Sequence, residues 1–291
     1  MFKKIGIFGK YNGIQSWESI DTLIQHLQSK SKTVFLDAAS CHDCPYECYG
    51  IEIIDRQELA QHIDVAIVVG GDGTFLDVAR TIVDQNIPIL GINLGRLGFL
   101  TDISPKEMIS ILDDVMEGIY ESEERNLIRV IIKKDDEILF DQLAFNDVVI
   151  HKTDSPRMIE FETFVDNRFF NSQRSDGMII STPTGSTAYG LSAGGPILDP
   201  ALDVLSLVSI NPHTMSNRPY VISGKSVVEL RPHEDCHSTA QIICDGQITY
   251  LISAGYRTIV TRHPNFIKMI HPKGHDHFEL LRAKLHWGDK L

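Results

Sequence analysis

The feature that most constrains the fold is an apolar strand, a glycine-rich turn and a helix that follow one another directly. Residues 64–80 read DVAIVVGGDGTFLDVAR. The run at 64–69 has β-branched residues on both faces, as a strand buried in a parallel sheet requires. Three of the four residues at 70–73 are glycine, which lets the backbone reach positive φ. The turn also lets a phosphate approach the N–H groups that begin the following helix.

The rest of the first hundred residues repeats this alternation. Further strands are expected at residues 4–8, 34–36 and 88–92. A helix between the first two is predicted by apolar residues on one face, namely Trp17, Ile20, Ile24 and Leu27. Strands that alternate with helices are typical of a doubly wound parallel sheet. We therefore expect an α/β domain over residues 1–100.

The pattern changes after residue 101. Ser104, Pro105 and Glu107 have the character of an N-cap, a first-turn proline and a capping partner for a helix that ends near residue 116. Alternating residues then predict strands around 128–132 and 159–165, and Asp245-Gly246 is the strongest hairpin signal. We expect a mainly β domain over residues 101–270 and a tail over 271–291 that packs back on the first domain.

Charge and composition exclude several classes of function. The chain has 27 Lys and Arg against 39 Asp and Glu, a net charge of −12. This argues against nucleic acid or an anionic membrane surface as the main partner, since both need a basic surface. No apolar run reaches the ~18–20 residues that cross a bilayer. With five cysteines and no export signal, a reduced cytoplasmic protein is expected.

Asp72 is the unusual member of the glycine turn, because a carboxylate repels a phosphate. It could accept a proton from an attacking hydroxyl, or hold a metal that bridges phosphates. The spacing matches neither the dinucleotide fingerprint nor the Walker A loop. The alternative is an ordinary turn in which Asp72 caps the helix.

A second segment, residues 178–198, has no charged side chain and is rich in glycine and hydroxyls. Such a segment suits a loop around a ribose and a base, where many hydrogen bonds converge. The alternative is a flexible linker, which apolar residues at both ends disfavour. The hydroxyls belong to Ser181, Thr182, Thr184, Ser186, Thr187, Tyr189 and Ser192.

Together with further motifs, these two turns resemble the bacterial NAD kinases. GGDGT alone is shared with lipid kinases, whereas the long Ser/Thr/Gly segment with the Asn-Asp pair is highly specific. The resemblance spans most of the chain, and residues 38–58 lack a clear counterpart. The motifs are GGDGT at 70–74, GINLGRLGFLTD at 91–102, FNDVVI at 145–150, SDGMIISTPTGSTAYGLSAGGP at 175–196, HTMSNRP at 213–219 and CDGQ at 244–247.

The resemblance implies a kinase that moves the γ-phosphoryl group of ATP, with a divalent metal such as Mg²⁺, onto the 2′-hydroxyl of the adenosine ribose of NAD. It implies an active site in the cleft between the two domains, and a homodimer or homotetramer. Two alternatives remain open here. A lipid or sugar kinase of the GGDGT superfamily is disfavoured by the negative charge and the polar second loop, and a non-catalytic dinucleotide sensor by the presence of Asp72.

The resemblance also implies roles for individual residues. Asp72 would be the proton acceptor, with Gly73 its neighbour on the dinucleotide. Asn146 and Asp147 match the Asn-acidic pair that holds NAD. The remaining contacts to the dinucleotide would come from Arg157, Arg174, Asp176, Thr187, Ala188, Tyr189, Gly190, Leu191, Ser192 and Gln247.

Some of these positions have simpler readings. Asn146-Asp147 could be a strand end or bulge, Asp245-Gly246 only a hairpin turn, and the two arginines ordinary surface residues. Phe99 is expected near the adenine. The bulk of Arg174 favours NAD over NADH as substrate.

Asp77 departs from the family pattern, because relatives often have a basic residue there to meet phosphate. It is not assigned to the site. The metal ligands are left unassigned.

Two other clusters are expected to be unremarkable. Cys41, His42, Cys44 and Cys48 could be a fragment of a zinc site, but no second knuckle matches them, and ordinary reduced thiols are expected. The histidines near the C-terminus share no helical face, so surface positions are expected for them; they are His271, His275, His277 and His286.

Overall fold

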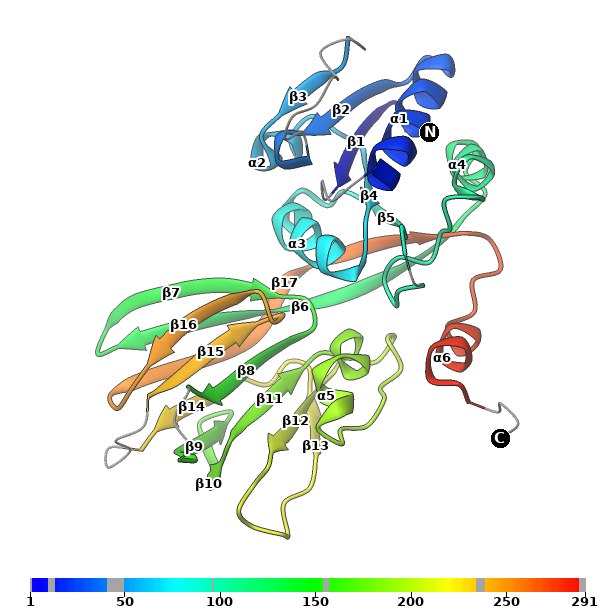
Figure 1. The fold of residues 1–291 in the computed structure, drawn as a ribbon. Coiled ribbons are helices and arrows are strands. Elements are labelled where there is room, and N and C mark those ends of the chain that lie inside the picture. Colours follow the sequence, from blue (N-terminus) through cyan, green and yellow to red (C-terminus); the bar gives the residue numbers. More distant parts are fainter. Residues whose placement is uncertain are drawn as a thin grey trace. The chain divides into compact units, whose positions relative to one another are not determined.

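The computed structural model describes residues 2–9, 14–40, 50–95, 97–153, 157–233 and 239–287. The chain divides into two compact units, the first of Met1–Glu124 with Ile267–Leu291 and the second of Arg125–Phe266. Two long strands, β6 (Glu121–Lys134) and β17 (Tyr256–His271), contain residues of both units (Figure 1). The domains expected from the sequence, with a boundary at residue 100, are divided differently from these units and stay a prediction.

The first unit contains a parallel sheet in the order β5-β4-β1-β2-β3. Because β1 lies inside the sheet and the chain builds outward from it on both sides, this is the expected doubly wound α/β arrangement. All five residues of β4 are buried, which agrees with the apolar run in the sequence. The strands are β1 (Lys4–Gly9), β2 (Thr33–Asp37), β3 (Glu52–Ile54), β4 (Val65–Val69) and β5 (Ile89–Ile92).

The helices of the first unit are amphipathic. α1 (Ile14–Ser29) places Ile20, Leu23, Ile24 and Leu27 in the core, which confirms the predicted helical face. No helix among the described residues is both long and apolar enough to span a membrane. The remaining helical elements of this unit are η1 (Ala38–Ser40), α2 (Arg56–Leu59), α3 (Asp72–Ile82), η3 (Val83–Gln85), α4 (Met108–Glu117) and α6 (His277–Leu285).

The predicted start of α4 is wrong. The helix begins at Met108, after Glu107, and residues 104–107 form a turn in which the Glu107 N–H donates to the Ser104 carbonyl at 3.1 Å. The Ser104 hydroxyl donates to the Glu107 carboxylate at 2.6 Å. Because Ser104 is engaged in this turn, it does not cap the helix.

The second unit is mainly β, as expected, and its own strand pairings are antiparallel. One sheet has the order β13-β12-β11-β8-β15-β16, and a second set of strands contains β10-β9-β14-β17 and the β6–β7 hairpin. Its strands are β7 (Glu137–Ala144), β8 (Asp147–Lys152), β9 (Ile159–Val165), β10 (Arg168–Ser175), β11 (Gly177–Ser181), β12 (Val204–Ile210), β13 (Tyr220–Ser223), β14 (Val228–Pro232), β15 (Ala240–Cys244) and β16 (Ile248–Ile252), with the short helices η4 (Thr184–Thr187) and α5 (Tyr189–Ser192).

The core of this unit is formed by the inward faces of both sets of strands. Ile128, Val130 and Ile132 of β6 and Phe161 of β9 pack with residues of β8 and β11 in one buried cluster. The alternation in the sequence therefore predicted the buried faces correctly.

Three hairpin turns in this unit use residues that tolerate positive φ. Asp135 has φ of +54°, and Asp166 and Asn167 have +50° and +60°. Asp245 and Gly246, at +52° and +66°, connect β15 to β16 and confirm the predicted hairpin.

Candidate active site

The glycine turn lies where β4 ends and α3 begins. The helix starts at Asp72, its N-cap is Gly71, and no side chain makes a capping hydrogen bond. The alternative in which Asp72 caps the helix is therefore wrong. A β4–turn–α3 unit at the carboxyl end of a parallel strand is where doubly wound sheets bind ligands.

The Asp72 carboxylate is bound instead by the loop that follows β5. Its Oδ2 accepts a hydrogen bond from the Phe99 N–H at 2.9 Å, and its Oδ1 accepts from the Leu100 N–H and the Thr101 Oγ1 hydroxyl, both at 3.1 Å. Neighbouring parallel strands end at the same sheet edge, which brings the two loops together. Because Oδ2 has a single donor among these three contacts, it retains capacity for a further hydrogen.

Two residues of the β5 loop support this contact. The Asn93 side-chain amide donates to Thr101 Oγ1 at 3.1 Å, which fixes the hydroxyl that faces Asp72. A Cβ on Gly98 would lie 2.0 Å from Asp72 Oδ1. Only glycine therefore fits at position 98 without displacing the carboxylate.

Asp77, which the sequence left without a role, is engaged in ion pairs. On α3 its carboxylate pairs with Arg56 of α2 and with Arg80, the latter at 3.2 Å. Arg56 also pairs with the fully buried Asp37 at 2.6 Å. The acidic residue at this position therefore joins α2 to α3.

In the second unit, two carboxylates meet at the start of β8. Asp245, in the β15–β16 turn, accepts hydrogen bonds from the backbone N–H groups of Phe145 at 3.0 Å, Asn146 at 2.8 Å and Asp147 at 3.2 Å. Three backbone N–H groups therefore hold the Asp245 carboxylate against residues 145–147. The FNDVVI and CDGQ motifs are thus in direct contact, and Gln247 lies in the same turn.

Asp147 lies in a different environment from Asp245. Only 4% of its surface is exposed, and burial together with the nearby Asp245 charge raises its pKa to about 7. The predictions of a strand end at Asn146-Asp147 and of a hairpin turn at Asp245-Gly246 are both correct as local structure. The sequence did not predict the contact of Asp245 with residues 145–147, although an Asp in a predicted tight turn next to a glycine was the available signal.

The Ser/Thr/Gly segment is ordered and packed, so the linker alternative is wrong. A Cβ on Gly185 would lie 2.1 Å from the Asn146 carbonyl oxygen. Thr182 Oγ1 donates to the Phe145 carbonyl at 2.7 Å, and Ser186 Oγ donates to the Pro183 carbonyl at 2.6 Å. These contacts attach the segment to the FNDVVI motif.

The hydroxyls of this segment fall into two groups. Four of them are buried, namely Ser181, Thr182, Thr184 and Ser186. The hydroxyls of Ser181, Thr182 and Ser186 donate to backbone carbonyls. The Thr184 hydroxyl accepts a hydrogen bond from Arg125 at 3.2 Å. These four hydroxyls therefore hold the segment in place, and none of the four is among the contacts to the dinucleotide that the resemblance implies. The residues that retain accessible surface are Thr187, Ala188, Tyr189, Leu191 and Ser192, while Gly190 is buried.

Arg125 is a residue that the sequence did not single out. It is buried in β6, and it lies in a run of charged and polar residues, ESEERN at 121–126, in which no single residue stands out. A buried guanidinium beside the Ser/Thr/Gly segment places a permanent positive charge there.

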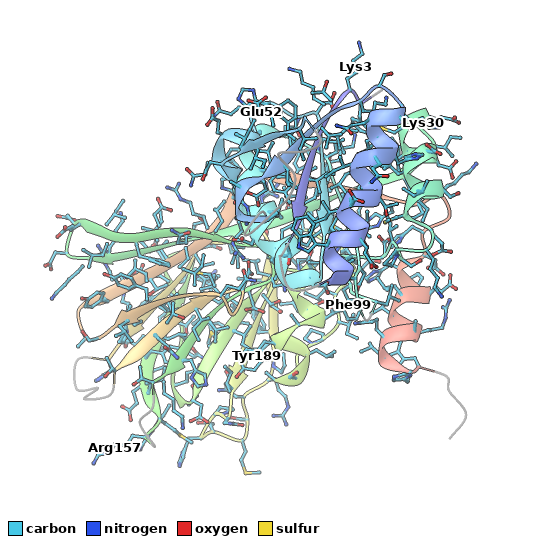
Figure 2. All side chains as sticks on the ribbon, turned by 45° about the horizontal axis from the view of Figure 1, so that its top comes forward. Lys3, Lys30, Glu52, Phe99, Arg157 and Tyr189 are labelled. Atoms are coloured by element: carbon cyan, nitrogen blue, oxygen red, sulfur yellow. The ribbon has the colours of Figure 1, made fainter. Side chains whose placement is uncertain are left out.

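The remaining predicted residues of the second unit lie nearer the surface. Asp176 pairs with Lys152 at 2.7 Å and accepts from Asn211 at 3.0 Å, and the Lys152 contact lowers its pKa. Arg174 is exposed and lies 3.4 Å from Glu160. Arg157 is exposed and projects from the strands (Figure 2). The surface positions of Arg174 and Arg157 are those of ordinary exposed arginines.

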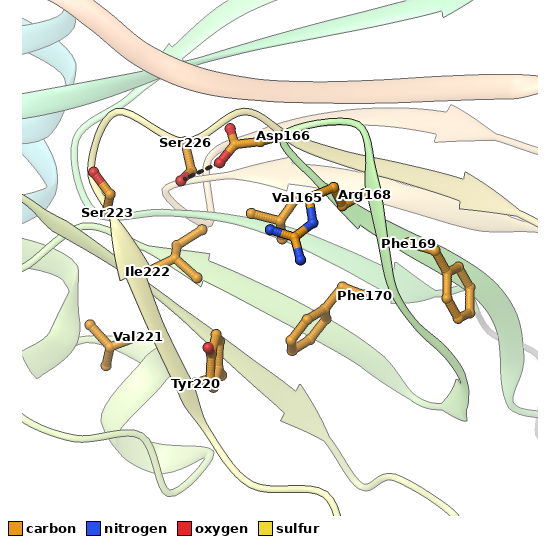
Figure 3. Close-up of a pocket in the computed structure, with 10 residues that line it drawn as sticks. All are labelled: Val165, Asp166, Arg168, Phe169, Phe170, Tyr220, Val221, Ile222, Ser223 and Ser226. Atoms are coloured by element: carbon orange, nitrogen blue, oxygen red, sulfur yellow. Dashed lines mark hydrogen bonds between the residues drawn. The ribbon is translucent and has the colours of Figure 1, made fainter.

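A cavity of about 480 Å³ in the second unit contains none of the predicted site residues. The Phe170 and Tyr220 rings lie side by side at its wall, with their centroids 5.3 Å apart (Figure 3). It is lined by β9, β10, β13 and the segments beside them.

The expectation that the C-terminal histidines are surface residues is wrong for His271, which is 3% exposed. Its Nδ1 lies 2.8 Å from Asp102 Oδ2 and its Nε2 lies 2.9 Å from Glu123. Burial opposes the charged ring, but the hydrogen bonds to both carboxylates outweigh it and raise the pKa of His271 to about 9. His275 Nδ1 also lies 2.9 Å from Asp102.

Asp102, His271 and His275 bring possible metal ligands within 4.8 Å of one another. A set with two imidazoles is not the all-oxygen set that Mg²⁺ prefers, and the Asp102 carboxylate already contacts both imidazoles. The Cys41, His42, Cys44 and Cys48 cluster lies outside the described residues.

Comparison with known proteins agrees with this arrangement. The ATP-NAD kinase N-terminal domain matches residues 22–120, and the ATP-NAD kinase C-terminal domain matches residues 145–272. The NAD kinase of Hydrogenovibrio crunogenus is 69% identical over 291 residues, which cover 100% of both chains. The NAD kinase of Nitrosococcus oceani is 45% identical over 100% of this chain and 98% of its own.

Solved structures show the same fold. Yeast NADH kinase complexed with NADH superimposes with a TM-score of 0.88 at 23% identity, over 99% of this chain and 89% of that one. An NAD kinase from Archaeoglobus fulgidus in complex with ATP gives a TM-score of 0.75 at 26% identity, over 97% and 98% of the two chains. These full-length matches favour NAD kinases over lipid or sugar kinases, and the chain belongs to the NAD kinase family.

Proposed function

We propose that this chain, an ATP-dependent kinase that converts NAD to NADP, uses Asp72 as the proton acceptor for the 2′-hydroxyl of the adenosine ribose. The observation that supports this role is the placement of Asp72. Its carboxylate lies in the first turn of α3, directly after the glycine turn, and three donors from the β5 loop fix its orientation.

The proposed mechanism follows from the demands of phosphoryl transfer. The transition state is loose, so catalysis depends mainly on alignment and on neutralising charge. Asp72 would orient the hydroxyl through Oδ2 and accept its proton as the bond to phosphorus forms. The N-terminal end of α3 favours negative charge from the phosphate.

We propose Mg²⁺ as the divalent metal. Mg²⁺ is commonly held by one or two carboxylates together with substrate phosphates. The one further contact that Asp72 Oδ2 can accept is given to the ribose hydroxyl, so the protein ligands of the ion stay unassigned. When bound, the ion would neutralise charge on the phosphates of ATP.

The second unit would hold the dinucleotide. The Asn146-Asp147 pair, Gln247 and the accessible part of the Ser/Thr/Gly segment are the proposed contacts, and the hydrogen bonds of Asp245 and Thr182 support them by joining these motifs. Asp176, Arg157 and Arg174 are proposed as further contacts to the dinucleotide. The bulk and charge of Arg174 support NAD over NADH as substrate; comparable turnover of the two would contradict this.

We also propose a homodimer or homotetramer. Large apolar side chains are exposed on β10 and β13, and each of these two strands lies at the edge of its sheet. Phe169 is 59% exposed and Tyr220 is 53% exposed. Such a patch on an unpaired strand edge is typical of a surface that another chain covers.

The first experiment measures NADP formation from NAD, ATP and magnesium, with the Asp72→Asn variant in parallel. Loss of one well-placed base costs about 10²–10⁴-fold in turnover, so kcat is expected to fall on that scale while NAD still binds. Asp77→Asn is the matched control, because it removes a carboxylate from the same helix. Near wild-type turnover in Asp72→Asn would remove Asp72 from the proposed role.

A further inference from the structure

The loop that holds Asp72 is itself held near both ends by the C-terminal segment. At one end, Asp102 Oδ2 accepts from His271 Nδ1 at 2.8 Å and lies 2.9 Å from His275 Nδ1. At the other end, the Leu97 carbonyl accepts a hydrogen bond from the Lys284 ammonium group of α6. The donors to Asp72 come from residues 99–101, between these two attachments.

These attachments are anchored rather than isolated on the surface. His271 also contacts Glu123 of β6 through Nε2, and its ring stacks on His275 with centroids 3.9 Å apart. The Lys284 ammonium lies 5.2 Å from the centroid of the Phe99 ring, a distance at which a cation is attracted to the ring face. The C-terminal segment therefore contacts the loop by ion pairs, a carbonyl hydrogen bond and a cation–π contact.

We infer that His271, His275 and Lys284, the C-terminal clamp, are positioning residues for phosphoryl transfer: they fix the loop at residues 97–102 and, through it, the Asp72 carboxylate. This inference rests on the proposed role of Asp72 as proton acceptor. None of the three touches Asp72 directly in the contacts above. A shift of about 1 Å in a catalytic group can cost 10²-fold in rate, so a loosened loop would affect kcat.

The kinetic test uses two substitutions that spare the buried His271. Lys284→Met removes the donor to Leu97, and His275→Phe keeps a stacked ring but removes the Nδ1 donor. Each is expected to lower kcat by about 5- to 50-fold and to leave KM for NAD and ATP within about twofold. Lys284→Arg should restore most of the lost kcat, because it keeps the donor and the charge.

Arg282→Met is the matched control, because it removes a cation from the same helix that pairs with Asp276. In an Asp72→Asn background, Lys284→Met and His275→Phe should cause no further loss, since the positioned group is already gone. Equal fold losses in both backgrounds, or an unchanged kcat in the wild-type background, would overturn the inference.

Amide hydrogen exchange separates this inference from the proposed function. The N–H groups of Phe99 and Leu100 donate to Asp72, so their exchange should become about 10-fold faster in the two clamp variants and stay unchanged in Arg282→Met. Unchanged exchange at both amides overturns the clamp. Wild-type kcat in Asp72→Asn, with faster exchange in the clamp variants, overturns the role of Asp72 while the loop attachment stands.

Discussion

At the scale of single residues, burial and a neighbouring charge change the acid–base behaviour of Asp147. Asp245 accepts hydrogen bonds from three backbone N–H groups. Burial of Asp147 and the nearby charge of Asp245 raise the pKa of Asp147 to about 7. A carboxyl whose folded-state pKa exceeds its ordinary value of 3.8 favours folding when it is protonated. This contribution is present below pH 3.8 and is lost as pH rises through about 7.

The Asp147→Asn substitution tests this assignment. The amide has the same shape and no charge to bury, so the free energy of unfolding at pH 8 should rise on the order of 1–4 kcal/mol above wild type, with little difference near pH 4. Urea unfolding at both pH values measures the effect. Asp136→Asn, at an exposed position, serves as the control. An equal change in the free energy of unfolding at both pH values in Asp147→Asn would contradict the raised pKa of Asp147.

Gly98 is a second residue whose identity follows from one contact. A methyl group there would lie 2.0 Å from Asp72 Oδ1, so Gly98→Ala must displace the carboxylate and should lower kcat by about 10- to 100-fold. Gly95→Ala, in the same loop, places its Cβ 3.9 Å from the nearest atom, Asn93 Oδ1, and should retain activity. Steady-state kinetics of both variants decides; similar activities would show that the loop adjusts freely.

At the scale of elements, the His271 ion pairs join the end of β17 to β6 and to the β5 loop. The charged and titratable groups that face His271 are Asp102, Glu123 and His275, and Glu121 of β6 contacts the adjoining turn at Gly274. Burial raises the pKa of Asp102, but its hydrogen bonds to the two histidines outweigh this and lower it to about 2. The shifts of His271 and Asp102 describe one interaction and are not additive.

This interaction predicts a loss of stability in alkali. The pKa of His271 is raised from 6.5 to about 9, so its contribution is complete below pH 6.5 and is lost as pH rises through about 9. The stability difference between wild type and His271→Gln should therefore shrink between pH 6 and pH 10, as measured by thermal unfolding. His62→Gln, a half-exposed histidine, is the control. A constant difference would mean that His271 is uncharged.

Helices, strands and turns were predicted correctly where the sequence has a clear periodicity or clear turn residues. The helix face of α1, the buried run of β4 and the Asp-Gly hairpin were all predicted, because periodicity and positive-φ residues act within a few positions. The start of α4 was not, since the Ser104 hydroxyl had two competing uses and bonded to the Glu107 side chain.

At the scale of the whole molecule, the exposed aromatic surface predicts self-association. Phe169→Ser with Tyr220→Ser should shift the chain from a dimer or tetramer toward the monomer in light scattering, because the pair removes the two most exposed aromatic side chains of β10 and β13. Leu251→Ser, which alters a 58% exposed side chain on β16, should leave the mass unchanged. A monomeric wild-type chain would contradict the proposed assembly.

The sequence by itself determined the helical face of α1, the buried run of β4, the glycine turn and the motifs that identify the family, because each depends on neighbours within a few residues. Tertiary structure alone decided that the β5 loop binds Asp72 across 27 to 29 positions, and that Asp245 holds residues about 100 positions away. It also decided that His271 is buried and charged. Burial, pKa and the direction of a hydrogen bond depend on groups that the fold brings together, and no local pattern encodes which groups those are.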